Sequence, residues 1–443
     1  MARELPEASL LENVRLNSLV FVPNVLQGLF RRRPQAVLAA TKADIDRRAV
    51  GLIGGIRSGK GPGPIWVRVG KDRSLLLLSR DDVRRALEGS PHPFASDPEA
   101  KRKGMAHFQP DALTISRGKQ WENRRRFTEA VLHTGKPLHR HSERFAAVAR
   151  EEAHDMLADA GSLGGRLDWD TFYAAFRRLT RRVVLGDAAR RDEAVSDLLA
   201  TLMDEANRLP SERSERYDEF MARIRGYLEA GEEGTLAGLS SEAPSDEETR
   251  VEGQLAHWLF ATQETLSTNA FRALALIASH PRQQATVKEE LAGVDLDSAA
   301  DIGSLAYLEA CLEEAMRLWP TTPLLSRETL EETSWDGAAV PAGAQLLISN
   351  TFDHRDGASH DFADRFAPEV WTEGDADEDW SFNHFSHGPQ GCPGAGLALF
   401  LGKAMLARIL TERPVRLAEP GLDPQKPLPH MLDFFRLRFE LGP

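Results

Sequence analysis

The alternation of apolar and polar residues predicts a mostly helical chain with a small amount of sheet. The clearest strand signal is residues 65–79, IWVRVGKDRSLLLLS, in which two short apolar runs flank a polar turn, as in a hairpin. Helical spacing of apolar residues then dominates from about residue 81 to 318. Within it, residues 230–246 are rich in Gly, Ser, Glu and Pro, and we expect a loop there that is too short to separate domains.

The longest predicted helix begins after this loop and runs to His280. Ser245 and Glu248 have the spacing of a capping box, and Pro281 ends the helical pattern. At about 1.5 Å per residue the helix would be a rod of about 50 Å. Because apolar residues cover much of its circumference, we expect it to run through the core. A further helix is predicted over residues 305–318.

Composition places the chain among globular proteins with a large core. Apolar residues make up 42% and charged residues 28% of its 443 residues, so it is not a disordered tail. The net charge of −12 argues against nucleic acid as a partner. Two cysteines, Cys311 and Cys392, cannot build a disulfide framework, so we expect a reducing, cytoplasmic location.

The first apolar stretch, residues 19–30, is too short to cross a bilayer and contains Pro23 and Asn24. Acidic residues precede it, which is the wrong flank for a signal peptide. Two interpretations stay open: an amphipathic segment on a membrane surface, helped by residues 31–33 (RRR), or a docked N-terminal helix. Neither implies stable membrane insertion.

Residues 54–61, GGIRSGKG, nearly form a phosphate-binding loop. That motif needs Ser or Thr after the lysine to hold magnesium, and Gly61 stands there instead. Pro62 and Pro64 forbid the helix that should follow. We therefore expect a flexible loop leading into the hairpin, and no nucleotide site.

Residues 385–394, FSHGPQGCPG, carry the most chemical information in the chain. Glycines surround Cys392, and a helix is predicted to follow over residues 397–410. A thiolate exposed just before a helix N-terminus is stabilised by backbone N–H groups and by the helix dipole. Such a sulfur can ligate a metal or attack an electrophile, whereas the plain alternative is a buried, inert cysteine.

Four residues of this loop, Phe385, Gly388, Cys392 and Gly394, match the pattern F-x-x-G-x-x-x-C-x-G. The pattern resembles the haem-binding loop of the cytochromes P-450, which are haem-thiolate monooxygenases. The resemblance implies that Cys392 is the axial ligand of the haem iron, where thiolate favours O–O cleavage. Ser386 stands where the family more often has Gly.

A competing metal site would use His384, His387 and Cys392 as three zinc ligands. A zinc site should include another nearby Cys, His or carboxylate, and the flanking Pro and Gly pattern fits haem better.

A second motif is Glu314 and Arg317, which share one helix face and can pair. Alone, such a pair is usually solvated and contributes little. With two prolines behind it, it resembles the family's E-x-x-R-x-x-P-x-x-P, in which the pair locks the core behind the haem. The family's usual third member, an Arg, is replaced by Val370, and Arg365 is one candidate substitute.

A third motif lies in the long helix, where residues 261–265, ATQET, resemble the family's A-G-x-[DE]-T. The resemblance implies that Glu264 and Thr265 are the acid–alcohol pair that delivers protons to bound oxygen. Thr262 replaces the usual Gly and adds bulk. Without the resemblance, Glu264 would be an ordinary surface residue, and the Thr265 hydroxyl would bond to the preceding turn.

The fourth motif is Gly118, Trp121 and Arg125, in the spacing G-x-x-W-x-x-x-R. The resemblance implies that Trp121 and Arg125 reach a haem propionate, and an Arg fork suits a carboxylate. Arg327 is implied as a second propionate ligand. Gln390 lies where many members place a propionate-contacting His or Arg, but it brings no charge.

Together the motifs imply a single domain over residues 1–443 with a mainly α fold and small β-sheets. By resemblance this is a triangular helical prism, with a long central helix over one haem b. The implied function is monooxygenation of a lipophilic or aromatic small molecule by a soluble, bacterial-type enzyme. Electrons would come from NAD(P)H through ferredoxin reductase and ferredoxin. The acid–alcohol pair favours this oxygen-dependent route over a peroxygenase or an oxygen-independent enzyme; a non-catalytic haem or zinc binder is the alternative of another class.

The resemblance also implies a substrate pocket and a docking face. The pocket would draw on apolar side chains of Phe94, Phe108, residues 194–227, Phe260, Ala261, Leu324, Leu325 and residues 432–434. The docking face would be a basic patch on the thiolate side, attracting an acidic ferredoxin. Its candidate residues are Arg124, Arg125, Arg126, Lys403 and Arg408.

Overall fold

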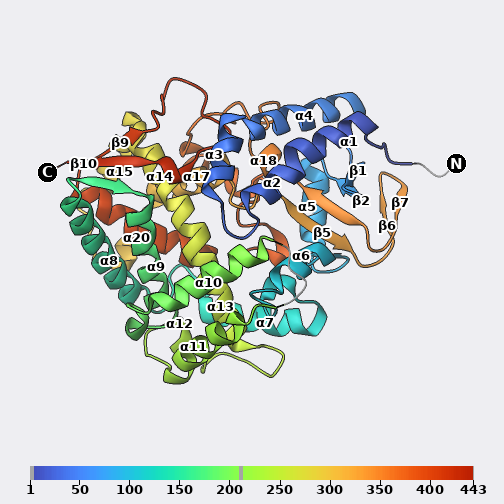
Figure 1. Ribbon diagram of the computed structural model, residues 1–443. Helices are drawn as coiled ribbons and strands as arrows, with labels where there is room; N and C mark the ends of the chain where they lie inside the picture. The colour runs from blue at the N-terminus through green and yellow to red at the C-terminus, as the bar shows by residue number, and fades with distance from the viewer. Residues whose placement is uncertain (1–3, 209–212, 443) are drawn as a thin grey trace.

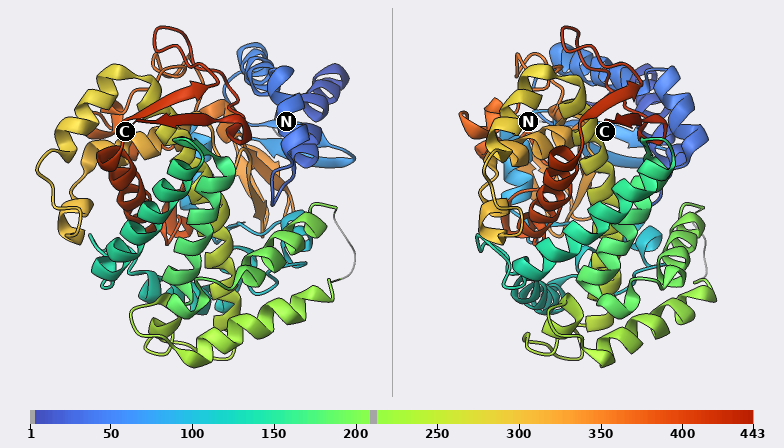
Figure 2. Two further views of the ribbon diagram at one scale, coloured as in Figure 1. Left: turned by 60° about the vertical axis from the view of Figure 1, so that its left-hand side comes forward. Right: turned by 90° about the vertical axis from the view of Figure 1, so that its left-hand side faces the viewer.

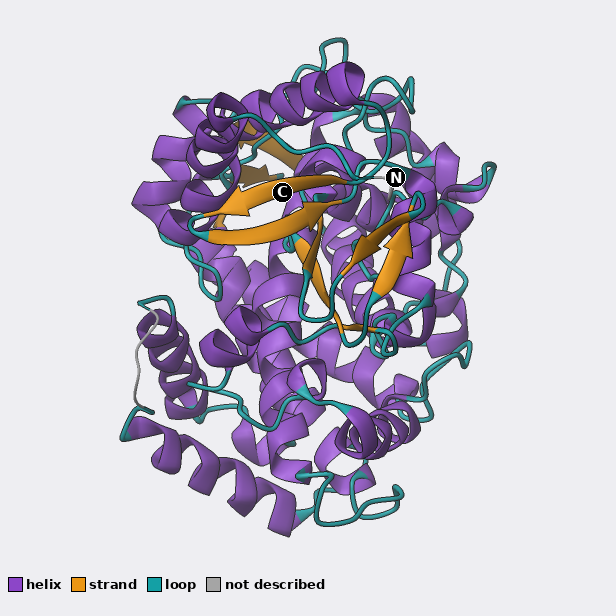
Figure 3. Ribbon diagram, turned by 90° about the vertical axis from the view of Figure 1, so that its right-hand side faces the viewer, coloured by secondary structure: helices purple, strands orange, loops and turns teal. Residues whose placement is uncertain are grey.

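Small sheets lie among many helices in the computed structural model, which describes residues 4–208 and 213–442 (Figures 1 and 3). The main sheet has the strand order β1-β2-β8-β5-β3. Its strands are β1 (Ile65–Val69), β2 (Asp72–Leu76), β3 (Phe94–Ala95), β5 (Leu325–Thr329) and β8 (Gln345–Ile348). The predicted hairpin is confirmed, because β1 and β2 pair antiparallel with Ile65 opposite Leu76.

Two smaller sheets complete the β structure. One has the order β4-β10-β9 and contains β4 (Arg166–Asp168), β9 (Val415–Glu419) and β10 (Arg438–Leu441). The other is a ribbon of β6 (Thr333–Trp335) and β7 (Ala338–Val340). The main sheet and the ribbon share a buried cluster that includes Trp335, Leu346 and Phe94.

The N-terminal helices cover one side of the main sheet. They are α1 (Leu10–Leu16), α2 (Val22–Gln27), α3 (Pro34–Lys42) and α4 (Ile45–Lys60), and a π-helical turn, Asn17–Phe21, joins the first two. The N-terminal segment is therefore a docked helix, as one of the two interpretations held. Its inner residues Leu16, Val20 and Phe21 pack with Ile53 and Ile65.

The prediction of a loop over residues 54–61 is wrong, because residues 54–60 belong to α4. Ala49, Ile53 and Ile56 have helical spacing and are buried against the N-terminal helices. Packing of this apolar face outweighs the low helix propensity of glycine, which costs about 1 kcal/mol per residue relative to alanine. Gly61, with φ +100°, ends the helix.

The helical body, drawn from two further sides in Figure 2, surrounds one large buried cluster of side chains. At its centre α8 packs on α9 and α20, and α14 packs on α17. The bounds of these helices are α8 (Ser142–Ser162), α9 (Trp169–Val184), α14 (Ser267–Ser279), α17 (Ala306–Leu318) and α20 (Ala395–Glu412). The helices predicted over residues 305–318 and 397–410 are thus confirmed.

The remaining helices lie at the edges of this body or lead into it. They are α5 (Arg80–Glu88), α6 (Glu99–Met105), α7 (Gly118–Leu132), α10 (Glu193–Ala206), α11 (Arg216–Ala230), α12 (Leu236–Leu239), α13 (Val251–Phe260), α15 (Pro281–Leu291), α16 (Ala299–Gly303), α18 (Asn350–Asp353) and α19 (Glu369–Thr372).

The long central helix consists of α13, a π-helical segment Ala261–Leu266, and α14. The capping box predicted for its start is wrong. The Asp246 side chain accepts bonds from the N–H groups of Glu248 and Thr249 instead, and the helix begins at Val251 after a left-handed Arg250. Its predicted end before Pro281 is confirmed, and Pro281 opens α15.

Glu314 and Arg317 form an ion pair with no exposed surface on either side chain. Arg317 also donates to the backbone carbonyls of His354 (3.0 Å), Ala363 (3.1 Å) and Arg365 (2.9 Å). The second Glu314 oxygen accepts from the Ala367 N–H at 2.8 Å. The Arg365 side chain does not substitute for the missing third Arg, since it is exposed and pairs with Asp361.

Candidate active site

Cys392 lies in the loop just before α20, after a single helical turn at Gly388–Gln390. Its N–H donates to the Phe385 carbonyl at 2.8 Å, which closes the loop. The side chain keeps exposed surface although most of α20 behind it is buried. Burial raises the pKa of the Cys392 thiol, while the Gly394 N–H and the Arg125 guanidinium act in the opposite direction. The thiol is thus presented to open space by a loop that donates to it, as an axial ligand requires.

The loop needs two residues in the left-handed region. Gly388 has φ +69°, and a Cβ there would lie 2.5 Å from the Leu87 carbonyl oxygen on α5, so only glycine fits. Ser386 has φ +58°, which explains why the family more often has Gly at this position. Its hydroxyl accepts a hydrogen bond from Arg327 at 3.2 Å, which ties the loop to β5.

Arg327 is buried without a carboxylate partner among the described residues. Its guanidinium donates to the Ser90 hydroxyl (2.8 Å), the Ser326 carbonyl (3.0 Å) and Ser386. Burial lowers its pKa to about 10. A buried guanidinium with only neutral partners is costly, so the position suits an anionic group beside it.

Lys101 on α6 is a second cation of this kind, which the motifs did not reveal. It donates to the carbonyls of Ser96 and Thr114, at 3.0 Å each. Burial, and the nearby charge of Arg327, lower its pKa to about 7. Two neighbouring cations would be stabilised by a carboxylate, and haem carries two propionates. The residues present therefore fit a haem group held by Cys392 with its propionates toward Arg327.

Arg125 on α7 lies beside the loop and contacts it directly. Arg125 donates to the Gly391 carbonyl and to Glu129, both at 2.6 Å, so it holds the backbone next to Cys392. Trp121 lies one turn earlier and is half-buried, and Gly118, with φ +52°, begins α7. The Gln390 side-chain oxygen is buried and has no hydrogen-bond partner in the described part of the chain.

Glu264 and Thr265 lie in the π-helical segment of the long helix. π-Helical turns widen a helix locally and are frequent at functional sites. The Thr265 hydroxyl donates to the Ala261 carbonyl, the bond to the preceding turn expected from the residues alone. Thr268 makes the equivalent bond to the Glu264 carbonyl at 2.8 Å.

The Glu264 carboxylate is held by two partners that the motifs did not predict. Tyr173 on α9 donates its hydroxyl to Glu264, and the Gln263 amide donates to the Tyr173 oxygen at 3.0 Å and to Glu264 at 3.3 Å. Burial raises the pKa of Glu264. The hydrogen bonds from Tyr173 and Gln263 lower it, but the effect of burial is larger. The interpretation of Glu264 as a surface residue is therefore wrong.

Some of the residues predicted to line the substrate pocket pack on one another, and others lie apart from them. Phe108 packs edge-on against Phe260 with ring centroids 5.5 Å apart, and Phe30 packs on Phe108 at 5.1 Å. Phe94 instead packs on Trp335 in the sheet cluster, so its predicted place with Phe108 is wrong. The helix pair over residues 194–227 is formed by α10 and α11, while residues 209–212 of that range lie outside the described residues.

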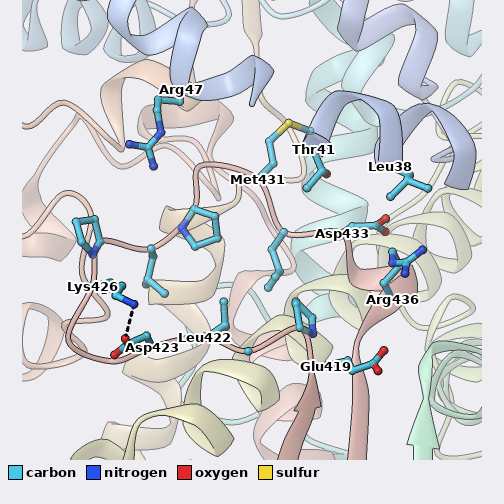
Figure 4. A pocket seen from close by; sticks show the side chains of 16 residues that line it. Leu38, Thr41, Arg47, Glu419, Leu422, Asp423, Lys426, Met431, Asp433 and Arg436 are labelled. Atoms are coloured by element: carbon cyan, nitrogen blue, oxygen red, sulfur yellow. Dashed lines mark ion pairs between the residues drawn. The ribbon is translucent and has the colours of Figure 1, made fainter. Parts of the chain in front are cut away.

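A cavity of about 780 Å³ lies elsewhere, between α3 and the C-terminal segment (Figure 4). Leu38, Thr41, Asp423, Leu432 and Asp433 are among its lining residues. Only the 432–434 turn is shared with the predicted substrate pocket, and no predicted haem-contacting residue lines the cavity.

The alternative zinc site is not formed. Within residues 4–208 and 213–442, no three His, Cys, Asp or Glu side chains are placed to hold a metal ion. The His387 ring bonds to the Phe382 carbonyl at 3.0 Å, and His384 lies 4.0 Å from Glu313.

Comparison with known sequences agrees with this geometry. The family model for cytochrome P450 matches residues 185–432, more than half of the chain. The chain therefore belongs to the cytochrome P450 family, and the prediction of a P450 monooxygenase is confirmed. A curated relative, cyclooctat-9-en-7-ol 5-monooxygenase of Streptomyces melanosporofaciens, is 28% identical over 391 residues, 79% of this chain and 83% of that protein. Another, methyltetrahydroprotoberberine 14-monooxygenase of Papaver somniferum, is 30% identical over 192 residues, 41% of this chain and 36% of that protein.

Solved structures show the same fold. A zebrafish cytochrome P450 with abiraterone superposes with a TM-score of 0.70 over 88% of this chain and 98% of that one, at 22% identity. A retinoic acid-bound cyanobacterial CYP120A1 superposes with a TM-score of 0.72 over 88% of this chain and 93% of that one, at 17% identity. The predicted mainly α P450 fold with small sheets is confirmed. Among the described helices, none has the length and apolar character needed to cross a membrane.

Proposed function

We propose that this P450 binds haem b through Cys392 and inserts one oxygen atom of O2 into a lipophilic small molecule. Electrons would come from NAD(P)H through ferredoxin reductase and ferredoxin. Thiolate-ligated haem supplies O–O cleavage when bound. The observation that carries the proposal is the hydrogen-bonded Glu264 beside Thr265, in a π-helical segment that packs against α20 behind the Cys392 loop.

The chain's own residues then have distinct tasks. Arg327 and Lys101 hold the propionates, and Arg125 fixes the backbone of the Cys392 loop. Glu264 is the buried acid: because burial raises its pKa, it can hold a proton and pass it on. The Thr265 hydroxyl, one residue along, is the donor that Glu264 recharges.

An apolar substrate is supported by the rings of Phe30, Phe108 and Phe260, which pack together on the α13 side of the site. Such aromatic walls bind lipophilic or aromatic molecules. Both curated relatives are named as monooxygenases of an organic molecule, one of cyclooctat-9-en-7-ol and the other of methyltetrahydroprotoberberine, which agrees with this substrate class.

Two spectroscopic and kinetic measurements test the proposed function. Reduced protein treated with carbon monoxide should show the Soret shift of thiolate-ligated haem. Single turnovers with O2 and electrons should then outpace those with peroxide alone, because Glu264 and Thr265 serve the oxygen-dependent route. A faster peroxide reaction would favour the peroxygenase alternative, and a missing Soret shift would refute thiolate ligation.

Replacing Tyr173 with Phe should lower the amount of product formed per electron pair. The variant keeps the ring stacked on Trp169 but loses the hydroxyl that donates to Glu264. A hydrogen bond to the protonated acid contributes about 0.5–1.5 kcal/mol, so we expect a loss of about 2- to 10-fold. Tyr227→Phe is the matched control, because Tyr227 donates to Asp192 on the periphery. Equal coupling in the two variants would exclude Tyr173 from proton delivery.

The predicted docking patch is mostly wrong. Arg124 is buried and pairs with Asp111, Lys403 is buried and pairs with Glu309, and Arg408 pairs with Asp297. Arg125 is engaged with the loop, which leaves Arg126, an exposed residue without an ion pair in the described part of the chain.

We therefore expect Arg126→Glu to slow reduction by ferredoxin, more at low salt than at high salt, because salt screens the attraction. The measurement is stopped-flow reduction followed by carbon monoxide trapping. Arg48→Glu on α4 has the same change of charge on another surface and should leave the rate unchanged. A rate for Arg126→Glu that equals the control at low salt would refute this docking site.

A further inference from the structure

Gln109 and His257 form a polar pair beside the aromatic residues of the predicted substrate pocket. Gln109 follows Phe108 in the loop after α6, and His257 lies on α13, one turn before Phe260. The Gln109 side-chain oxygen and His257 Nδ1 are 2.5 Å apart. The rings of Phe108 and His257 both lie near that of Phe260, with centroids 5.5 Å and 6.2 Å from it. The pair therefore borders the aromatic wall on which an apolar substrate would pack.

Both members of this pair keep an unused hydrogen-bonding group. The Gln109 side chain is 2% exposed, and its amide nitrogen makes no hydrogen bond within the described residues. His257 is half-buried, and its Nε2 likewise has no hydrogen-bond partner in that part of the chain. Because a buried amide without a partner costs free energy, this position suits a ligand group that completes it.

Loose packing of the loop does not explain the unpaired amide, because a second glutamine shows that the loop is firmly docked on α13. Gln254 lies one turn before His257, and its side chain accepts from the Leu113 N–H at 3.2 Å. It donates to the Asp111 carbonyl at 2.7 Å and to the Thr249 carbonyl at 3.0 Å. The same loop and the same helix thus satisfy this glutamine and leave the other one incomplete.

The chemistry of the pair selects a hydroxyl group. Burial, and the nearby charge of Lys101, lower the pKa of His257 to about 4, so the ring is neutral at neutral pH and carries one N–H. If that N–H points to the Gln109 oxygen, the free groups are the Gln109 amide N–H and the bare Nε2 of His257. If the amide is turned the other way, they are the Gln109 oxygen and an N–H at His257 Nε2. Either arrangement offers one donor and one acceptor, and a hydroxyl satisfies both.

We propose that Gln109 and His257 bind a hydroxyl group that the substrate already carries. This role rests on the proposed function and narrows its substrate class to a lipophilic alcohol. His257 lies eight residues before Thr265, about 12 Å along the helix axis. The bound hydroxyl therefore anchors the substrate at a distance from Thr265, and a different carbon is presented for oxidation.

Calorimetric titration of the holoprotein with pairs of probes tests the proposal. The probes are cyclododecanol, menthol and fenchol, each compared with its ketone, which accepts hydrogen bonds but donates none. We expect at least one alcohol to bind about 2- to 10-fold more tightly than its ketone, the range for one added hydrogen bond. Gln109→Met and His257→Phe should each remove this preference. Gln284→Met is the matched control and should keep it, because Gln284 lies on α15 and donates to the Val415 carbonyl instead.

Three outcomes would overturn the proposal. The first is that no alcohol binds wild type more tightly than its ketone, absence of binding included; this comparison needs no variant. The second is a preference that persists in folded Gln109→Met and His257→Phe proteins. The third is tighter binding of cyclododecanecarboxylate than of cyclododecanol, which would assign the position to an anion beside Lys101.

Carbon monoxide spectra of the same samples separate this proposal from the proposed function. A thiolate-haem spectrum in wild type without any preference for alcohols refutes only the hydroxyl site. A missing thiolate-haem spectrum in wild type refutes the proposed function, and the hydroxyl site with it.

Discussion

Glu314→Gln is expected to lower the free energy of unfolding by about 3–5 kcal/mol, the usual cost of removing one partner of a buried ion pair. Glutamine keeps the shape of the side chain and can still accept the Ala367 N–H. The substitution removes the negative charge that pairs with the Arg317 guanidinium. Because neither side chain has exposed surface, water cannot replace that charge. Such a loss is a large fraction of the stability of most domains, so little holoprotein should accumulate.

Urea unfolding monitored by the haem absorbance measures this effect, with purification at low temperature to recover the variant. Glu99→Gln is the matched control, because Glu99 also pairs with a cation, Lys103, but both side chains are largely exposed. Its unfolding midpoint should stay near that of wild type. A Glu314→Gln midpoint equal to that of the control would show that the backbone carbonyls alone stabilise Arg317.

Those carbonyls explain why the chain tolerates Val370. Arg317 donates to the carbonyls of His354, Ala363 and Arg365, which come from a segment 37 to 48 residues further along the chain. The motif predicted the pair, because i, i+3 spacing on a helix is local. It did not predict these acceptors, since a backbone carbonyl has no sequence signature and its direction depends on the path of the loop.

Local patterns predicted local structure well. The β1–β2 hairpin, α17 and α20 follow from apolar runs and their proline or glycine boundaries. The glycine-rich stretch of α4 is helical against its glycine and proline content, because Ile53 and Ile56 are buried with Leu16 of α1 and the turn that follows it. Tertiary packing overrides propensity in such cases.

In the candidate site, too, residues within a local motif could be predicted and residues brought in by tertiary packing could not. The order and spacing of the motifs predict Cys392, Glu264 and Arg327 as site residues, because each belongs to a short segment with a fixed local geometry. Tyr173, which donates to Glu264 from 91 residues away, and Lys101, which lies near Arg327, had no local signal. The charge of Lys403 suggested a surface residue, but the ion pair with Glu309 allows its burial, so sequence alone could not assign it to a docking face.

The two cysteines allow a direct test of thiolate ligation. Cys392→Ala should abolish the Soret shift of the reduced, carbon monoxide-treated protein and reduce product formation to background, because no other thiol can reach that position. The fold should survive, since the Cys392 side chain is exposed and its loop is held through the backbone by Phe385 and Arg125.

Cys311→Ala is the matched control for this variant. Cys311 lies on α17 with no exposed surface, and burial raises the pKa of its thiol well above the usual range, so it stays protonated and is not a ligand. This variant leaves a small cavity, so its free energy of unfolding should fall by about 1 kcal/mol, the cost of removing a buried group of about the size of a methylene. It should keep the thiolate spectrum. A folded Cys392→Ala protein that retains the spectrum, or a folded Cys311→Ala protein that lacks it, would show that the sulfur of Cys392 is not the ligand.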